Sequence, residues 1–245
     1  MTPRATILNG DPESPVLLHV TQQARLTRPC DASPPARRET LDRAAESVAR
    51  SARTHSTIRP HLIVNELSPT TGDAGRPGGD GPEDVQPYAW LVADLVDERL
   101  AATGRAFIVD IHSPVSDQSP VGDPSAPCPE VLLNVDGRHL PPALLDAAVS
   151  AFGELTSPVT DAPHAGRYVP QLRHRGDQRV QAISLSIRES VLLDGHFAVN
   201  PESVERLGRA IGQVVGCVDA VGAPDPRRPP CRPVDQSGEC PTPVL

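Results

Sequence analysis

Short apolar, β-prone stretches alternate with amphipathic helical stretches along most of this chain. The apolar stretches are predicted to be strands at 15–20, 61–66, 105–111, 130–135 and 181–188. Helical spacing of apolar residues predicts helices at 39–52, 88–104, 141–155 and from Pro201 onward. Gly104 is expected to end the second helix, and Asn200 is expected to be the N-cap of the last one. This alternation predicts a single three-layer α/β/α domain built on a mostly parallel or mixed sheet.

Composition suggests where this domain begins and ends. We expect residues 1–14 to be a flexible N-terminus and residues 15–222 to form the domain. The stretch 223–245 is rich in proline and lacks apolar periodicity, so it is predicted to be a disordered tail. Long loops are expected at 68–87 and 113–129, and loops of this length inside a domain are usually functional or mobile.

The charge and the cysteine content narrow the class of protein. The formal net charge of −8 argues against a nucleic-acid partner or an anionic membrane surface, because phosphate binding needs clustered positive charge. No signal peptide and no apolar run of membrane-spanning length is recognisable, so we expect a cytoplasmic protein. The five cysteines form no CxxC pair, which favours reduced thiols.

The strand at 105–111 carries two residues that are costly to bury, Asp110 within it and His112 directly after it. Ligand sites of open α/β sheets lie beyond the carboxyl ends of the strands, where His112 is expected. Taken alone, Asp110 could cap a loop and His112 could be hydrogen-bonded scaffold. A metal site would need two or three further ligands at the same edge.

Four segments in order resemble the N-formylglutamate amidohydrolase family. They are "VLLHVTQQARL", "LIVNELSPTTGDAGR", "AFIVDIHS" with "PEVLLNVDGRHLPPALLDAAVSAF", and "PHAGRYVPQLRHRGDQRVQAISLSIRESVLLD". The resemblance implies the fold of zinc carboxypeptidase-like hydrolases. It also implies hydrolysis of a formamide C–N bond, with a zinc-activated water and a carboxylate as general base.

Several positions that carry the family's zinc chemistry differ in this chain. The family's first motif reads His-Val-Pro-His-Ser, and its second histidine, a zinc ligand, corresponds here to Gln22. The acidic ligand falls near Arg38 and Glu39, the third ligand matches His112, and the catalytic glutamate corresponds to Ser186. An amide is a poor substitute for imidazole on zinc, and a serine hydroxyl is not basic near neutral pH. The resemblance therefore implies a degenerate zinc site.

The family's substrate pocket is retained only in part. In the loop after "LIVN", the positions of two family arginines are occupied here by Glu66 and Pro69. The residues that match are Asp73, Arg76, Tyr168, Arg173 and His174. With Asp110 they are our candidate ligand-binding residues, because an arginine fork suits a carboxylate. The alternative is that they are solvated or packed scaffold.

These observations favour a non-hydrolytic protein that has no cofactor. We expect this protein to bind a small carboxylate, an acyl-amino acid or a partner protein. An active zinc amidohydrolase with a rearranged ligand set is the alternative, and His19 is then the most plausible additional ligand. A cofactor-free enzyme acting through His174, Asp110 or a cysteine is a third possibility.

Overall fold

A seven-stranded sheet in the order β1-β3-β2-β4-β7-β5-β6 forms the middle layer of the protein. The computed structural model describes residues 5–20, 35–66, 85–113, 130–135, 140–153, 159–160, 171–174 and 177–220. The strands are β1 (Ala5–Leu8), β2 (Val16–Val20), β3 (His61–Asn65), β4 (Ala106–His112), β5 (Val131–Val135), β6 (Val159–Thr160) and β7 (Val180–Ile187). The adjacent strands β3, β2, β4 and β7 run parallel. β1 pairs antiparallel with β3, β5 pairs antiparallel with β7, and β6 pairs parallel with β5. The predicted mixed sheet is therefore confirmed.

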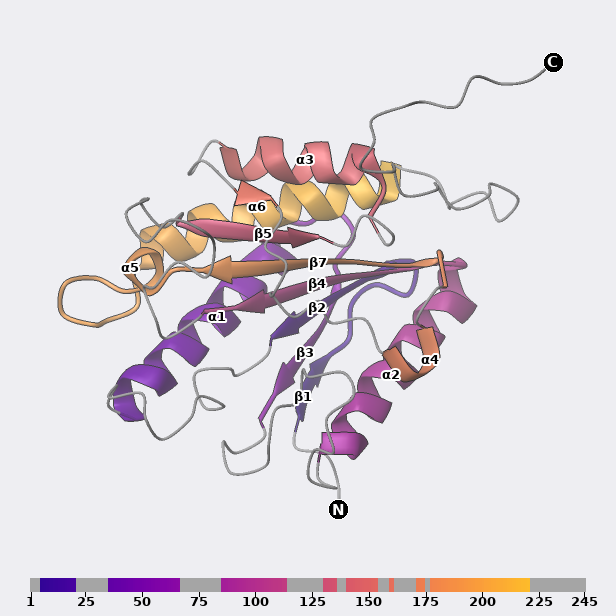
Figure 1. Ribbon diagram of the computed structural model, residues 1–245, viewed down its shortest axis with the longest axis horizontal. Helices are drawn as coiled ribbons and strands as arrows, with labels where there is room; N and C mark the ends of the chain where they lie inside the picture. The colour runs from indigo at the N-terminus through magenta and orange to yellow at the C-terminus, as the bar shows by residue number, and fades with distance from the viewer. Residues whose placement is uncertain are drawn as a thin grey trace, which may run out of the picture.

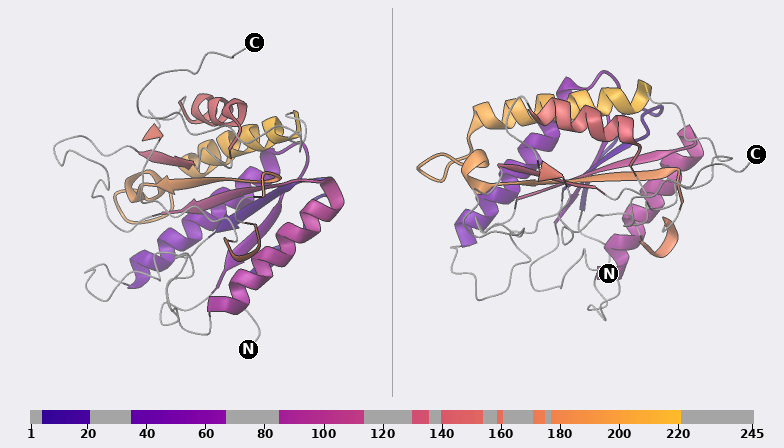
Figure 2. Two further views of the ribbon diagram at one scale, coloured as in Figure 1. Left: turned by 45° about the vertical axis from the view of Figure 1, so that its right-hand side comes forward. Right: turned by 45° about the horizontal axis from the view of Figure 1, so that its top comes forward.

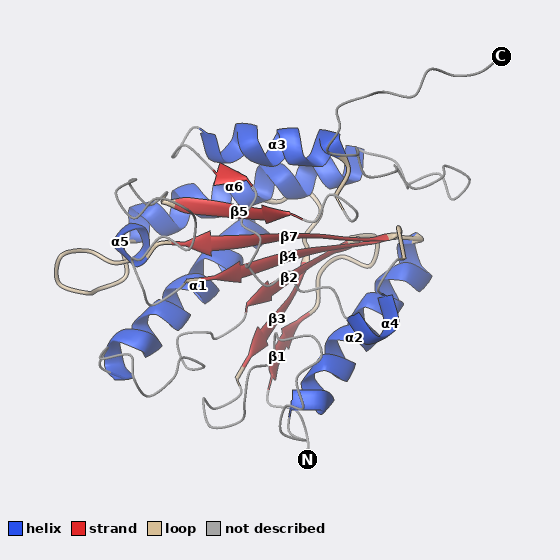
Figure 3. Cartoon of the chain, in the orientation of Figure 1, coloured by secondary structure: helices blue, strands red, loops and turns tan. Residues whose placement is uncertain are grey.

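Helices cover both faces of this sheet (Figures 1 and 3). The helices α1 (Pro35–His55), α3 (Pro142–Gly153) and α6 (Pro201–Ala220) pack on one face, and α2 (Val85–Thr103) packs on the other. Two short helices, α4 (Gln171–His174) and α5 (Glu189–Leu192), flank β7 in the sequence. The three layers are visible in the rotated views of Figure 2, and they confirm the predicted α/β/α fold.

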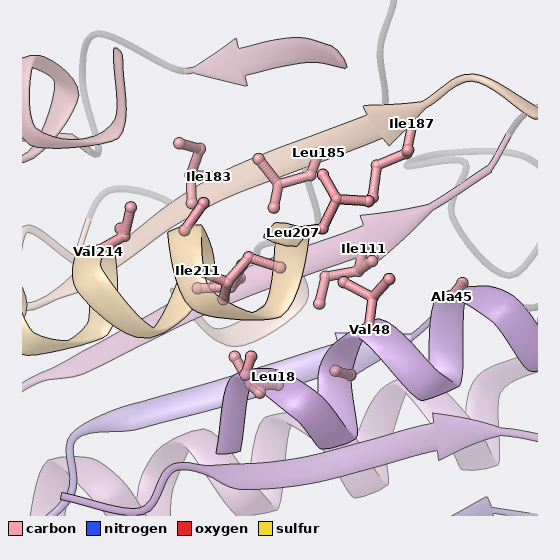
Figure 4. Close-up of a cluster of buried hydrophobic side chains, with 14 of the residues drawn as sticks. Leu18, Ala45, Val48, Ile111, Ile183, Leu185, Ile187, Leu207, Ile211 and Val214 are labelled. Carbon is pink, nitrogen blue, oxygen red and sulfur yellow. The ribbon is translucent and has the colours of Figure 1, made fainter. Parts of the chain in front are cut away.

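The apolar core is split between the two faces because strand side chains alternate. On β4, Phe107, Val109 and Ile111 join the cluster under α1, α3 and α6, while Ala106 and Ile108 join the cluster under α2. Figure 4 shows side chains of β2, β4 and β7 meeting those of α1 and α6 in the larger cluster. Burying a Leu or Ile side chain stabilises the fold by about 1.5–3 kcal/mol each, so this double-sided packing holds the strands rigidly.

Two helix ends follow the chemistry that the sequence predicts. The Asn200 side-chain oxygen accepts a hydrogen bond from the Ser203 amide at 3.2 Å, which caps the first turn of α6. Gly104 ends α2 with a φ of 76°, and its amide donates to the Leu100 carbonyl at 2.9 Å. This left-handed conformation favours glycine over residues with a Cβ atom.

The N-terminal segment differs from its prediction. Residues 5–8, expected to be flexible, form β1 and pair antiparallel with β3. Pairing with an existing strand satisfies the backbone groups of this segment without the need for a long apolar pattern. The sequence also gave no indication of α4, α5 or β6, which are too short for periodicity to reveal. The predicted tail at 223–245 and most of the two predicted long loops lie outside the described residues.

No helix in the described ranges combines the length and the apolar character needed to cross a bilayer.

Candidate functional site

A chain of polar side chains lies on the α2 face of the sheet, at the carboxyl ends of the central parallel strands. It comprises His19 on β2, Asp110 and His112 on β4, Ser184 and Ser186 on β7, and Tyr88 on α2. Along each strand the apolar residues of this face come first and the polar ones follow. The register places Asp110 beside both His19 and Ser184, and it places His112 beside Ser186 (Figure 1 shows the strands).

Asp110 occupies the centre of this arrangement. Its Oδ1 atom lies 2.8 Å from Nδ1 of His19, and its Oδ2 atom accepts a hydrogen bond from the Ser184 hydroxyl at 3.0 Å. Nε2 of His19 lies 2.8 Å from the hydroxyl of Tyr88, which reaches down from α2. The side chains of His19, Asp110, Tyr88 and Ser184 are all buried. Each buried polar group thus has a partner, as burial requires.

Asp110 is ionised despite its burial. Desolvation raises the pKa of its carboxyl group, but interactions with His112 and His19 outweigh this and hold the pKa well below its ordinary value. A carboxylate only accepts hydrogen bonds, so His19 donates through Nδ1 and the Ser184 hydroxyl donates through Oγ. Asp110 therefore sets the direction of the hydrogen bonds around it.

His112 extends the chain toward Ser186. Its Nδ1 atom lies 3.4 Å from Oγ of Ser184 and 3.6 Å from Oδ2 of Asp110, while its Nε2 atom lies 2.6 Å from Oγ of Ser186. His112 is buried, and Ser186 is half-buried. The two ring nitrogens of His112 are thus both next to serine hydroxyls.

These residues do not match the requirements of a zinc ion. Zinc sites in proteins use imidazole, thiolate and carboxylate ligands, and serine hydroxyls are not among them. The hydroxyl of Ser186 lies at the Nε2 atom of His112, and the Asp110 carboxylate is bound by His19 and Ser184. Across the ranges that the structure describes, no group of three or more His, Cys, Asp or Glu side chains is arranged to hold a metal ion.

The second predicted ligand position is at the start of α1. Glu39 is exposed there, and Arg38 is partly buried. α1 packs on the face of the sheet opposite to the polar chain around Asp110. Gln22, the other replaced ligand, lies outside the described residues.

Arg173 and His174 lie against α2 rather than beside His112. Nη1 of Arg173 donates to Asp94 at 2.6 Å and to Asp97 at 2.8 Å, and its guanidinium stacks over Trp90 at 4.8 Å. His174 is buried, with Nε2 3.4 Å from Oδ1 of Asp97.

Both aspartates are bound through the same nitrogen of Arg173, Nη1, and a guanidinium carries further N–H donors on Nη2 and Nε. The role of Arg173 in ligand binding therefore stays a prediction. The remaining candidate ligand residues, Asp73, Arg76 and Tyr168, lie outside the described residues.

A small cavity opens at the same end of the sheet, where β7 runs into α5. It has a volume of about 260 Å³, and its lining includes Arg37, Glu189, Ser190 and Phe197. The guanidinium of Arg37 forms an ion pair with Glu189 and lies 4.6 Å from the ring centroid of Phe197. The carboxyl edge therefore combines a polar chain on one face with a partly charged cavity near the other.

Sequence reasoning identified Asp110, His112 and Ser186 but assigned no role to Ser184 or Tyr88. The strict alternation in "SLSI" already placed Ser184 and Ser186 on one face of a strand, and "VDIH" places Asp110 and His112 in the same way. These two patterns together could have predicted that the four residues share one face of the sheet if the two strands are neighbours. Tyr88 carries no comparable signal, because its role depends on how α2 packs.

Comparisons with known proteins agree with the resemblance in the sequence. The family model described as N-formylglutamate amidohydrolase matches residues 85–193, which include His112 and Ser186 but not Gln22 or Arg38. Comparison with curated protein sequences gave no significant match.

Among solved structures, two with TM-scores above 0.5 show the likeness in fold. The N-formylglutamate amidohydrolase from Ralstonia eutropha JMP134 is 16% identical, with a TM-score of 0.62 over 90% of this chain and 98% of that one. A gene product from Agrobacterium tumefaciens is 17% identical, with a TM-score of 0.56 over 90% of this chain and 96% of that one. A metallo-carboxypeptidase from Pseudomonas aeruginosa is 11% identical, with a TM-score of 0.42 over 89% of this chain and 61% of that one.

The expected relationship is confirmed at two levels, local sequence and overall fold. This chain is an α/β protein of N-formylglutamate amidohydrolase-like fold, and over residues 85–193 its sequence matches the model of that family.

Proposed function

We propose that this protein binds a small carboxylate or an acyl-amino acid at the carboxyl edge of the sheet and does not hydrolyse it with zinc. The observation that carries the proposal is the environment of His112, the zinc-ligand position that this chain retains. Its Nε2 atom lies 2.6 Å from the hydroxyl of Ser186, which stands where the family has its catalytic glutamate. A hydroxyl provides neither a strong zinc ligand nor a base for a zinc-bound water.

The fold supports a ligand site at this edge. After β2 the next strand along the chain is β3, on one side of β2, and after β4 the next strand is β5, on the other side of β4, so a crevice is expected between β2 and β4. His19 and Asp110 are neighbours at that point. The buried charge of Asp110 keeps the surrounding donors in fixed orientations, which favours a polar ligand over an apolar one.

Metal content tests the first half of the proposal. Protein purified without chelator should contain far less than one zinc ion per chain by elemental analysis. Equimolar zinc that survives dialysis in the wild type and in His196→Ala, but is lost in His112→Ala, would contradict the proposal. Zinc-dependent release of formate from N-formyl-amino acids would support the alternative, an active amidohydrolase with a rearranged ligand set.

Thermal shift measurements test the second half. Small dicarboxylates and N-acyl-amino acids at millimolar concentration should raise the melting temperature, because a ligand at 100 times its Kd stabilises the native state by about 2.7 kcal/mol. Asp110→Asn should reduce the shift, while Asp146→Asn, at an exposed position on α3, should not. If no ligand of these classes changes the melting temperature, the small-ligand proposal is wrong and a partner protein becomes the better hypothesis.

A further inference from the structure

We propose that Ser186 is a nucleophile activated by His112, and that the protein is a metal-independent acyl hydrolase acting on small carboxylic esters. The inference rests on the proposed function in one respect, which is that no metal is bound at Nε2 of His112. It goes further because it assigns chemistry to Ser186, the residue at the position of the family's glutamate.

The distances match those of a nucleophile with its base. Oγ of Ser186 lies 2.6 Å from Nε2 of His112, within the range in which a histidine can accept a hydroxyl proton. On the other side of the ring, Nδ1 lies 3.4 Å from Oγ of Ser184, which donates to Asp110 at 3.0 Å. The arrangement is a serine–histidine–aspartate chain in which a second serine connects the histidine to the aspartate.

The direction of the hydrogen bonds leaves His112 in the form that a general base needs. Asp110 only accepts, so the proton of the Ser184 hydroxyl points to Asp110. The Ser184 oxygen is then available to accept the Nδ1 proton of His112. A neutral imidazole with its proton on Nδ1 has a lone pair on Nε2, and that lone pair faces the Ser186 hydroxyl.

Burial distinguishes Ser186 from the other residues of the polar chain. Ser186 is half-buried, in the last residue pair between β4 and β7, whereas the others named here are buried: His19, Asp110, His112 and Ser184. The residues that orient the base are therefore shielded from water. The hydroxyl that would react belongs to the residue of this polar chain that is nearest to the carboxyl ends of β4 and β7 and is only half-buried.

The reaction uses groups that the chain and water supply. The Oγ atom of Ser186 attacks the ester carbonyl carbon, the Oγ proton passes to Nε2 of His112, and that proton then goes to the departing alkoxide. The C–O bond of the ester breaks and an acyl-serine forms. Water attacks the acyl-serine, giving one proton to Nε2, and the return of that proton to Oγ regenerates Ser186 and releases the carboxylic acid.

The alternative is that Ser186 and His112 form a hydrogen bond with a purely structural role. An alkyl fluorophosphonate separates the two readings, because it reacts with an activated serine by forming an O–P bond and expelling fluoride. The full chain should be labelled once, and peptide mapping should place the label on Ser186. Ser186→Ala should lose the label, and Ser150→Ala, which removes an exposed serine on α3, should keep it.

Variants of His112 and Ser184 test the roles of these two residues. His112→Gln should slow labelling by about 10²–10⁴-fold, the contribution typical of a general base. Ser184 is a positioning residue, so Ser184→Thr, which keeps the hydroxyl, should label at nearly the wild-type rate. Ser184→Val has the shape of threonine without the hydroxyl and should label much more slowly. Both labelling rates are measured well below the melting temperature of each variant.

Several outcomes would overturn the inference. They are an unlabelled wild type, a label mapped to another residue, an unchanged rate in His112→Gln, and equal rates in Ser184→Thr and Ser184→Val. Labelling is measured with and without a chelator, so it is read independently of the zinc content. A zinc-free protein that is not labelled would remove this inference and leave the proposed function intact.

Discussion

At the scale of single residues, the structure shows how the chain accommodates ionisable groups inside the sheet. Asp110 remains charged because interactions with His112 and His19 lower its pKa. His19 and Ser184 donate hydrogen bonds to it, and a buried carboxylate without such donors would be strongly destabilising. His61 illustrates the opposite case. Its Nδ1 atom accepts the Gly10 amide at 3.1 Å, and Nη1 of Arg99 lies 2.8 Å from its Nε2 atom.

The pKa of His61 is lowered from 6.5, mainly by burial and then by the charge of Arg99. In the unfolded chain His61 therefore binds its proton at higher pH than in the folded protein. The free energy of unfolding should fall as the pH drops below about 6.5. His61→Gln should make this fall shallower in urea titrations at stepwise pH, and the exposed His196→Gln should not. Parallel pH profiles for the wild type and His61→Gln would contradict the assignment.

At the scale of elements, the packing of α6 on α1 depends on glycine. A Cβ atom on Gly208 would lie 2.2 Å from Oγ of Ser51 and 3.0 Å from the backbone nitrogen of Ala52. The Ser51 hydroxyl also donates to Glu205 on α6 at 3.0 Å, so the two helices meet closely there. Gly216, two turns further along α6, has no atom within 4 Å of such a position.

These two glycines form a matched pair for mutation. Gly208→Ala should destabilise the protein by about 1–3 kcal/mol, because the added methyl group overpacks the contact with α1. Gly216→Ala should stabilise it by up to about 1 kcal/mol, since alanine is the better helix former. Denaturant unfolding measures both changes. Equal effects of the two substitutions would show that the α1–α6 contact is looser than described.

At the scale of the whole molecule, stability resides in two apolar layers on either side of the sheet. The larger layer lies under three helices and the smaller one under α2 (Figure 2). The polar chain at Asp110 shares the α2 face with the smaller layer, and it lies beyond that layer along the strands. The larger layer can thus hold the strands in register while the opposite face carries polar residues.

Two phenylalanines test this distribution of stability. Phe107 is buried in the larger layer on β4, and Phe107→Ala should cost about 3–5 kcal/mol. Phe197 is 54% exposed and contacts Arg37, so Phe197→Ala should cost no more than about 1 kcal/mol. Thermal and urea unfolding would compare them, and similar losses would refute the division into core and surface.

The predictions from sequence succeeded where local patterns are strong. Strand alternation and helical periodicity placed β2, β3, β4, β5, β7 and the long helices within a few residues of their observed bounds. The Asn200 cap and the Gly104 stop were also predictable, because each depends on the chemistry of one residue and its immediate neighbours. The β1 strand escaped prediction because its partner, β3, lies more than fifty residues away in the sequence.

The arrangement of the candidate site was likewise predictable from the sequence only in part. The sequence by itself determined that Asp110 and His112 share a strand face, that Ser184 and Ser186 share another, and that Ser186 stands at the position of the family's glutamate. Only the tertiary structure decided that β4 and β7 are neighbours in a register that brings Nε2 of His112 to Oγ of Ser186. It also decided that Arg173 pairs with aspartates of α2. Period-2 alternation shows which residues share a face, whereas strand order and register depend on the packing of helices and strands distant in the sequence.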